Sequence, residues 1–153
     1  KHDAEQAMRP ASPPPDTQRR VPPVPPLIIA AFLLIHGAIH LSYLSPRPPA
    51  TATGPAWPFT LEKSWLLSRV GVPRELLRML GLALSAVTFA AFVLAAISIV
   101  GLLPTSLWAP AVALGAGSSL ALLVLYFHPW LVLGMAIDAV LLVATFFYQP
   151  VGT

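Results

Sequence analysis

The sequence predicts an all-α integral membrane protein, a bundle of four transmembrane helices that follows an extended, proline-rich N-terminal tail. The chain has 153 residues, of which 56% are hydrophobic and 10% are charged, whereas soluble domains carry about 25% charged residues. Every Lys and Arg lies at or before Arg78, and beyond that point Asp138 is the only formally charged side chain. Four long apolar runs fill most of the remaining chain. Together these observations indicate a protein that belongs in a bilayer.

The first segment, residues 1–26, contains eight prolines among charged and small polar residues. Such a composition cannot offset the entropy of ordering by burying apolar surface. We therefore expect an extended tail. Its VPPVPP run favours polyproline II, which is typical of a stiff spacer leading into the membrane or, alternatively, of a segment that docks on a partner.

The transmembrane domain is predicted to cover residues 27–150. At about 1.5 Å per helical residue, each apolar run is near or above the roughly 30 Å of a hydrocarbon core. The connections between the second and third runs and between the third and fourth are so short that these helices should be antiparallel neighbours. The predicted helices cover residues 27–44, 79–103, 108–127 and 130–148.

A longer connection, residues 45–77, joins the first two runs. Its first half is extended by prolines. In its second half Thr60 could cap a short helix with Leu61, Trp65 and Leu66 on one side, which would lie on the membrane surface; a plain loop is the alternative. Tryptophans favour the head-group region because their rings are amphipathic. We therefore expect four of them at the membrane interface: Trp57, Trp65, Trp108 and Trp130.

Ionisable residues inside the apolar runs converge on one half of the predicted bundle. With alternating helix directions, His36 and Asp138 both lie about 12 Å inside the same membrane face. His40 is one turn nearer that face on the same side of the helix as His36, and His128 closes the third run there. A charged Asp near mid-bilayer costs about 2.5–3.5 kcal/mol on insertion scales. Asp138 should therefore face the bundle and find a partner, and His36 is the expected one.

Several interpretations of this cluster are open. The first is a buried hydrogen bond between Asp138 and His36 that only locks two helices together, with no cofactor, and the sequence favours it. A haem or chlorophyll-type pigment could instead be held by His36 or His40, with His128 or a partner subunit as the second ligand of a bis-histidine haem. A metal ion could be bound by His36, His40 and Asp138. Proton handling or quinone contact by the His and Asp pair is the fourth.

Small residues recur at four-residue spacing in two of the predicted helices. In lipid, such rows let helix backbones approach closely. We expect internal packing of the bundle from them, with a docking face for another subunit as the alternative. They are Ala109, Ala113, Gly117 and Ala121 in the third run, and Gly81 and Ser85 in the second.

The first and last runs resemble a group of small bacterial four-helix membrane proteins. Their opening helix carries a His-Gly-x-Ile-His-Leu pattern, and GMAIDAVLL, with Asp138, is similar to their closing helix. The resemblance implies four helices and a location in the bacterial inner (cytoplasmic) membrane, and no activity. The residues that match the opening pattern are His36, Gly37, Ile39, His40 and Leu41.

The chain shows none of the common catalytic motifs: it has no phosphate loop, no Gly-x-Ser-x-Gly elbow, no dinucleotide fingerprint and no cysteine. Ser118 and Ser119 lie mid-helix with no evident base. We therefore expect a non-catalytic accessory subunit of a larger bacterial membrane complex, such as one for electron transfer or photosynthesis, whose partners are the bilayer and other membrane subunits. The alternatives are a cofactor-binding or proton- or quinone-handling protein that uses the cluster, and a small transporter. The cations form no basic stripe, which argues against nucleic acid.

Overall fold

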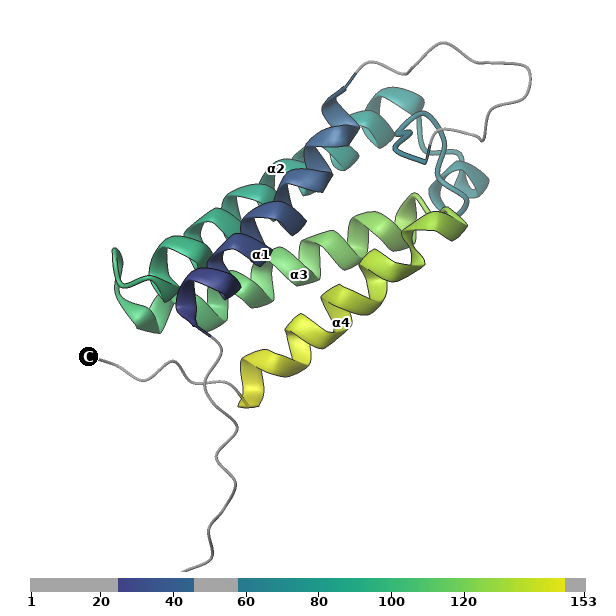
Figure 1. The fold of residues 1–153 in the computed structure, drawn as a ribbon. Coiled ribbons are helices and arrows are strands. Elements are labelled where there is room, and N and C mark those ends of the chain that lie inside the picture. Colours follow the sequence, from purple (N-terminus) through teal and green to yellow (C-terminus); the bar gives the residue numbers. More distant parts are fainter. Residues whose placement is uncertain (1–24, 46–57, 148–153) are drawn as a thin grey trace, which may run out of the picture.

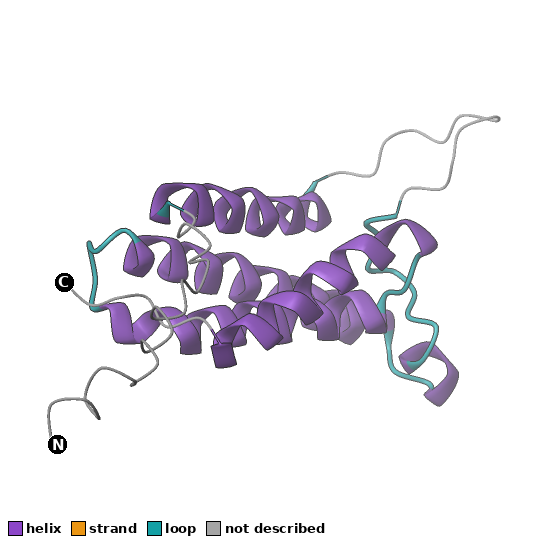
Figure 2. Ribbon diagram, turned by 60° about the horizontal axis from the view of Figure 1, so that its bottom comes forward, coloured by secondary structure: helices purple, strands orange, loops and turns teal. Residues whose placement is uncertain are grey.

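The computed structural model describes residues 25–45 and 58–147; the predictions for residues 1–24 and for Trp57 lie outside these ranges. Within them the chain is helical and has no strand (Figure 2). Four helices are long and apolar enough to cross a membrane, which confirms the predicted all-α class with four candidate spans. The elements are α1 (Pro26–Ile39), η2 (His40–Leu44), η3 (Leu67–Val70), α2 (Arg74–Ile99), η4 (Thr105–Leu107), α3 (Trp108–Leu125), η5 (Pro129–Leu131) and α4 (Val132–Phe147), where η denotes a 3-10 helix.

The long helices alternate in direction, and each packs on its neighbour in the chain (Figure 1). α2 packs on both α1 and α3, and α3 packs on α4. The end of α1, residues 58–73 and the turn between α3 and α4 all lie at one end of the bundle, which we call the connection end. The opposite end is the tail end. Consecutive helices are therefore antiparallel, as the short connections predict.

The second helix begins earlier and ends sooner than its hydropathy suggests. α2 starts at Arg74 rather than Met79 and ends at Ile99. Its first turns carry charged side chains, which hydropathy excludes from a membrane run, although they do not oppose a helix. Pro73 sets the start because its ring fixes φ and cannot continue a helix backwards. Gly101, at φ 81°, ends the helix in the left-handed conformation that glycine adopts without strain.

Residues 58–73 fold over the connection end instead of forming the surface helix expected there. No helix begins at Thr60. The Ser64 hydroxyl donates to the carbonyl of Leu125 at 2.6 Å, and the Trp65 indole N–H donates to the carbonyl of Val124 at 2.6 Å. The last carbonyls of a helix have no partner within the helix. The segment therefore adopts the loop that brings these donors to the end of α3.

The interior contains two apolar clusters at different heights. The tail-end cluster is built on Ala30, Leu33, Phe92, Ala95, Ala96, Ile99, Trp108, Ala111, Val112 and Ala116. The connection-end cluster is built on Tyr43, Leu61, Leu77, Leu122 and Tyr126. Among the predicted interface tryptophans, Trp108 is therefore a core residue, whereas Trp65 and Trp130 are 46% and 65% exposed at the connection end.

The row of small residues predicted on α3 lies beside its packing face. Ala109, Ala113 and Gly117 are half-buried and Ala121 is exposed. A strict four-residue repeat moves gradually around a helix of 3.6 residues per turn and leaves the packing face. The buried positions stay on that face because they are separated by either three residues or one. On α2, Gly81 and Ser85 are buried, but Gly81 faces Leu61 of the connection. The buried positions of α3 are Trp108, Ala111, Val112, Gly115, Ala116, Ser119, Leu122 and Leu123.

Two glycines allow α1 and α3 to approach Phe92 of α2. A Cβ on Gly37 would lie 3.1 Å from the Phe92 Cβ, and one on Gly115 would lie 3.0 Å from two ring carbons. Phe92 is fully buried, so a shift of its ring would disturb the side chains packed around it. A Cβ on Gly117, two residues further along α3, would meet nothing within 4 Å.

We expect opposite effects from the same substitution at these two α3 glycines. Gly115→Ala should lower the free energy of unfolding by about 1 kcal/mol, because overpacking against Phe92 costs about 1–3 kcal/mol and exceeds the gain in helix propensity. Gly117→Ala should raise it by up to about 1 kcal/mol, because only the propensity gain remains. Unfolding of the purified chain in mixed micelles measures both. Equal effects would contradict the packing of Phe92 against Gly115.

Candidate functional site

Four buried polar side chains meet between the two apolar clusters. His36 comes from α1, His40 from the start of η2, Ser119 from α3 and Asp138 from α4. Their exposed fractions are 5%, 3%, 0% and 0%. We call these four residues the polar network. It joins three of the four long helices at one height.

Hydrogen bonds link the polar network into a closed loop. His36 Nε2 lies 2.8 Å from Asp138 Oδ1. The Ser119 hydroxyl lies 2.5 Å from Asp138 Oδ2 and 2.7 Å from His40 Nε2. His40 Nδ1 lies 3.1 Å from the backbone carbonyl oxygen of His36, which closes the loop. Both carboxyl oxygens of Asp138 are thus engaged.

Helix geometry explains why these residues meet. His36 and His40 are four positions apart, so they share a face of the first helix. Ser119 lies six residues before the end of α3 at Leu125, and Asp138 lies six residues after the start of α4 at Val132. Because α3 and α4 are antiparallel and joined at the connection end, equal counts give equal depth.

Aromatic rings enclose His36 on two sides. Phe32 stacks on its imidazole with ring centroids 5.9 Å apart, and Phe92 meets it edge-on at 5.3 Å. The His40 ring is also edge-on to that of His36, at 5.5 Å. α2 contributes Phe92 and no titratable group to these contacts. The network is therefore surrounded largely by apolar surface, where hydrogen bonds are strong and unpaired charges are costly.

The hydrogen positions in the network are constrained by its acceptors. A backbone carbonyl only accepts, so His40 Nδ1 must carry a hydrogen. In a neutral His40 ring, Nε2 is then bare and can only accept. An ionised Asp138 also only accepts. The Ser119 hydroxyl lies between these two groups and has a single proton to donate, so one of its two short contacts lacks a hydrogen unless the network binds a further proton.

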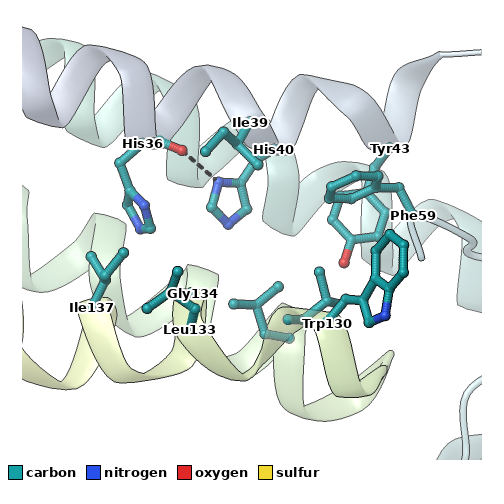
Figure 3. A pocket seen from close by; sticks show the side chains of 11 residues that line it. His36, Ile39, His40, Tyr43, Phe59, Trp130, Leu133, Gly134 and Ile137 are labelled. Atoms are coloured by element: carbon teal, nitrogen blue, oxygen red, sulfur yellow. Dashed lines mark hydrogen bonds between the residues drawn. The ribbon is translucent and has the colours of Figure 1, made fainter.

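A cavity lies beside the network, between α1 and α4 (Figure 3). Its empty volume is about 580 Å³, counted with its open mouth. His36 of α1 and His40 of η2 line it on one side, while Gly134 and Ile137 line it from α4. The two histidines are therefore the members of the polar network that contact this space.

The structure brings together most of the predicted cluster. His36 pairs with Asp138, as their common depth predicts, and His40 joins them. His128 does not take part: it lies in the turn before η5, where its Nδ1 accepts from the Trp130 backbone N–H at 3.2 Å.

The ring nitrogens of the network are used for hydrogen bonding. Three of the four nitrogens of His36 and His40 have partners within the network, so an axial bond from His40 to a haem or pigment would break one of them. In the described parts of the chain, no group of three or more metal-ligating side chains is placed to hold a metal ion. The arrangement thus has the donors and acceptors with which a proton can be held and exchanged.

Sequence reasoning missed Ser119 and Tyr43. Ser119 has no candidate base near it in the sequence, because its partners lie 79 positions before it and 19 after it in the chain. The depth count that paired His36 with Asp138 would also have found it. Tyr43 follows His40 by three positions in η2, and in a 3-10 helix such residues lie one above the other. It therefore continues the cavity wall, which an α-helical projection does not indicate.

No protein-family model matches the chain, and neither a curated protein nor a solved structure matches it. The site is therefore interpreted from its own geometry.

We expect Asp138→Asn to be tolerated and Asp138→Leu to be destabilising. An asparagine can accept from His36 and donate to Ser119, which then donates to His40, so the loop of hydrogen bonds is kept. Its free energy of unfolding should stay within about 1 kcal/mol of the native value. Leucine leaves the His36 donor buried without a partner and should cost about 3 kcal/mol. Unfolding in mixed micelles distinguishes these outcomes, and equal losses would contradict the proposed bonding.

Proposed function

We propose that this chain is a multi-pass protein of the bacterial inner membrane that holds and relays one proton within the polar network. The observation that carries the proposal is the Ser119 hydroxyl, which makes short contacts with Asp138 and His40 although it has one proton to give. Both contacts become hydrogen bonds when the network carries one proton more than an ionised Asp138 and a neutral His40.

That proton has two resting positions. On His40 it makes an imidazolium that donates to Ser119, and Ser119 donates to the Asp138 carboxylate. On Asp138 it makes a carboxylic acid that donates to Ser119, and Ser119 donates to the bare Nε2 of His40. The two arrangements contain the same atoms and the same number of protons, and both have zero net charge. Net neutrality is favoured where burial penalises an isolated charge.

The surroundings favour local proton exchange over conduction across the membrane. The tail-end cluster separates the network from one end of the bundle, and the connection-end cluster separates it from the other. The cavity between α1 and α4 reaches His36 and His40 from the side. A proton would therefore enter or leave through this cavity, which argues for exchange with a bound molecule rather than for a transporter.

Infrared spectroscopy of the chain in nanodiscs tests the relay. The carboxylic-acid C=O band of Asp138 is assigned as the band lost in Asp138→Asn. We expect His40→Gln to change this band, because Ser119 connects the two groups. In a Ser119→Ala background the same His40 change should have a much smaller effect, as a double-mutant cycle requires for coupling through a shared partner.

Ser98→Ala is the matched control. Ser98 is fully buried on α2, and its hydroxyl donates only to the Leu94 carbonyl of its own helix, at 2.9 Å. Removing that hydroxyl should leave the Asp138 band unchanged. A band that does not respond to His40→Gln in the native background would reject the relay and leave the network with a packing role.

A second candidate is the accessory subunit of a larger membrane complex, with electron-transfer and photosynthetic complexes as the expected kinds. It is supported by the half-exposed row of small residues on α3. Gly117 has open space where a side chain would be, and Ala121 is exposed. Such a surface admits the backbone of another helix at close range in lipid.

Native mass spectrometry of the chain, extracted in mild detergent from cells that make it, tests the subunit role. We expect a complex heavier than one chain for the native sequence and its loss in Gly117→Leu, because the larger side chain would hold the partner helix away. Val140→Leu is the control, since Val140 is exposed on α4. A single-chain mass for the native protein would contradict this role.

A further inference from the structure

We propose that the cavity between α1 and α4 binds a lipophilic carbonyl compound with a flat ring, of the quinone class, and that the Tyr43 hydroxyl donates to its carbonyl oxygen. This site goes beyond the relay. It depends on the cavity and on Tyr43, and it would exist even if no proton moved between Asp138 and His40.

The Tyr43 hydroxyl is the observation that points to a ligand. Tyr43 is 6% exposed, and no described residue offers its hydroxyl a hydrogen-bond partner. In Figure 3 the hydroxyl points from the α1 side of the cavity towards α4. A buried hydroxyl without a partner is costly and uncommon. A ligand with an acceptor oxygen in the cavity would remove that cost.

The position of the cavity indicates that the ligand comes from the bilayer. The lining residues of α1 and α4 lie within two candidate spans, Pro26–Leu44 and Pro129–Phe147. Leu133, which lines the cavity, is 72% exposed on the outer side of α4. The walls are apolar apart from the histidines, the Tyr43 hydroxyl and the indole N–H of Trp130. A lipophilic compound could therefore enter sideways without crossing water.

Aromatic side chains favour a ring over an acyl chain. Tyr43 and Phe59 meet edge-on with ring centroids 5.2 Å apart, and Trp130 lies across from them on the cavity wall (Figure 3). Flat rings pack on such groups in offset or edge-on geometry, with a gain beyond simple burial.

The polar groups are spread along the cavity. Tyr43 stands near the end with Trp130, His36 stands near the other end, and His40 lies between them (Figure 3). A ring with carbonyl oxygens on opposite edges can contact the polar groups at both ends of the cavity at once. A phospholipid ester has its carbonyl on a flexible chain and no ring, so it matches Tyr43 but not the aromatic walls.

Three probes separate these possibilities with the full chain in phosphatidylcholine nanodiscs. They are decyl benzoquinone, decylbenzene, which lacks the carbonyls, and a fatty-acid methyl ester, which lacks the ring. Affinity is obtained from the rise of the unfolding temperature with probe concentration. We expect tight binding of the benzoquinone alone, and Tyr43→Phe should weaken it about three- to tenfold, the effect of losing one hydrogen bond.

A matched pair of substitutions tests the location. Ile137→Phe fills the cavity from α4 and should weaken benzoquinone binding at least about tenfold, because the added ring occupies the site. Val140→Phe adds the same ring one turn along α4, at a position that is 67% exposed and does not line this cavity. It should leave the affinity unchanged. This pair also decides the question if Tyr43→Phe fails to fold.

Three results would overturn the proposal. They are no binding of the benzoquinone, equal binding of the methyl ester with the same dependence on Tyr43, or a benzoquinone affinity that neither Tyr43→Phe nor Ile137→Phe changes. The second result would identify a site for lipid ester groups. None of these variants touches Ser119 or Asp138, so failure of the ligand site and failure of the relay are separate outcomes.

Discussion

A carboxyl group buried in an apolar bundle must be hydrogen-bonded or neutralised, because its isolated charge costs several kcal/mol in such surroundings. Asp138 is the one buried residue of α4. The rest of that helix is half-buried or exposed and packs chiefly on α3. Apolar burial alone therefore leaves the rotation of α4 about its axis poorly specified. Any of its apolar faces could contact either lipid or α3 at a similar free energy. The bonds from Asp138 to His36 and Ser119 select a single rotation.

The same pairing accounts for the cavity. α1 and α4 are not neighbours in the chain, and the side chains of His36 and Asp138 join them at the network. On the connection-end side of this bridge the facing residues include Gly134, which has no side chain with which to fill the space. The polar bridge on one side and the aromatic residues of the cavity wall on the other thus keep a volume open that direct packing of two helices would have closed. Network and cavity are two consequences of one long-range contact.

Some features of the fold and the site can be predicted from the sequence because they depend only on position along a helix, whereas others depend on how the helices are rotated. Hydropathy and counting along helices identify the four spans and the pairing of His36 with Asp138, because both depend on distance from a helix end. They do not give rotation about a helix axis, so the four-residue row on α3 is displaced from the true packing face. Ser119 carries too weak a hydropathy signal to stand out in an apolar run. The position of Tyr43 depends on the change from α-helical to 3-10 geometry at His40, and no residue pattern in the sequence predicts that change.

The proposed relay and the proposed ligand site are coupled through the histidines. Moving the shared proton from Asp138 to His40 leaves the net charge at zero but places a positive ring on the cavity wall. A carbonyl oxygen near that ring favours the arrangement with the proton on His40, because its partial negative charge interacts better with an imidazolium than with a neutral imidazole. By linkage, the same arrangement must bind the carbonyl compound more tightly, by the same free energy. A ligand without a carbonyl would occupy the volume and leave the proton distribution unchanged, so the chemistry of the bound head group, rather than occupancy of the cavity, would set the state of the network.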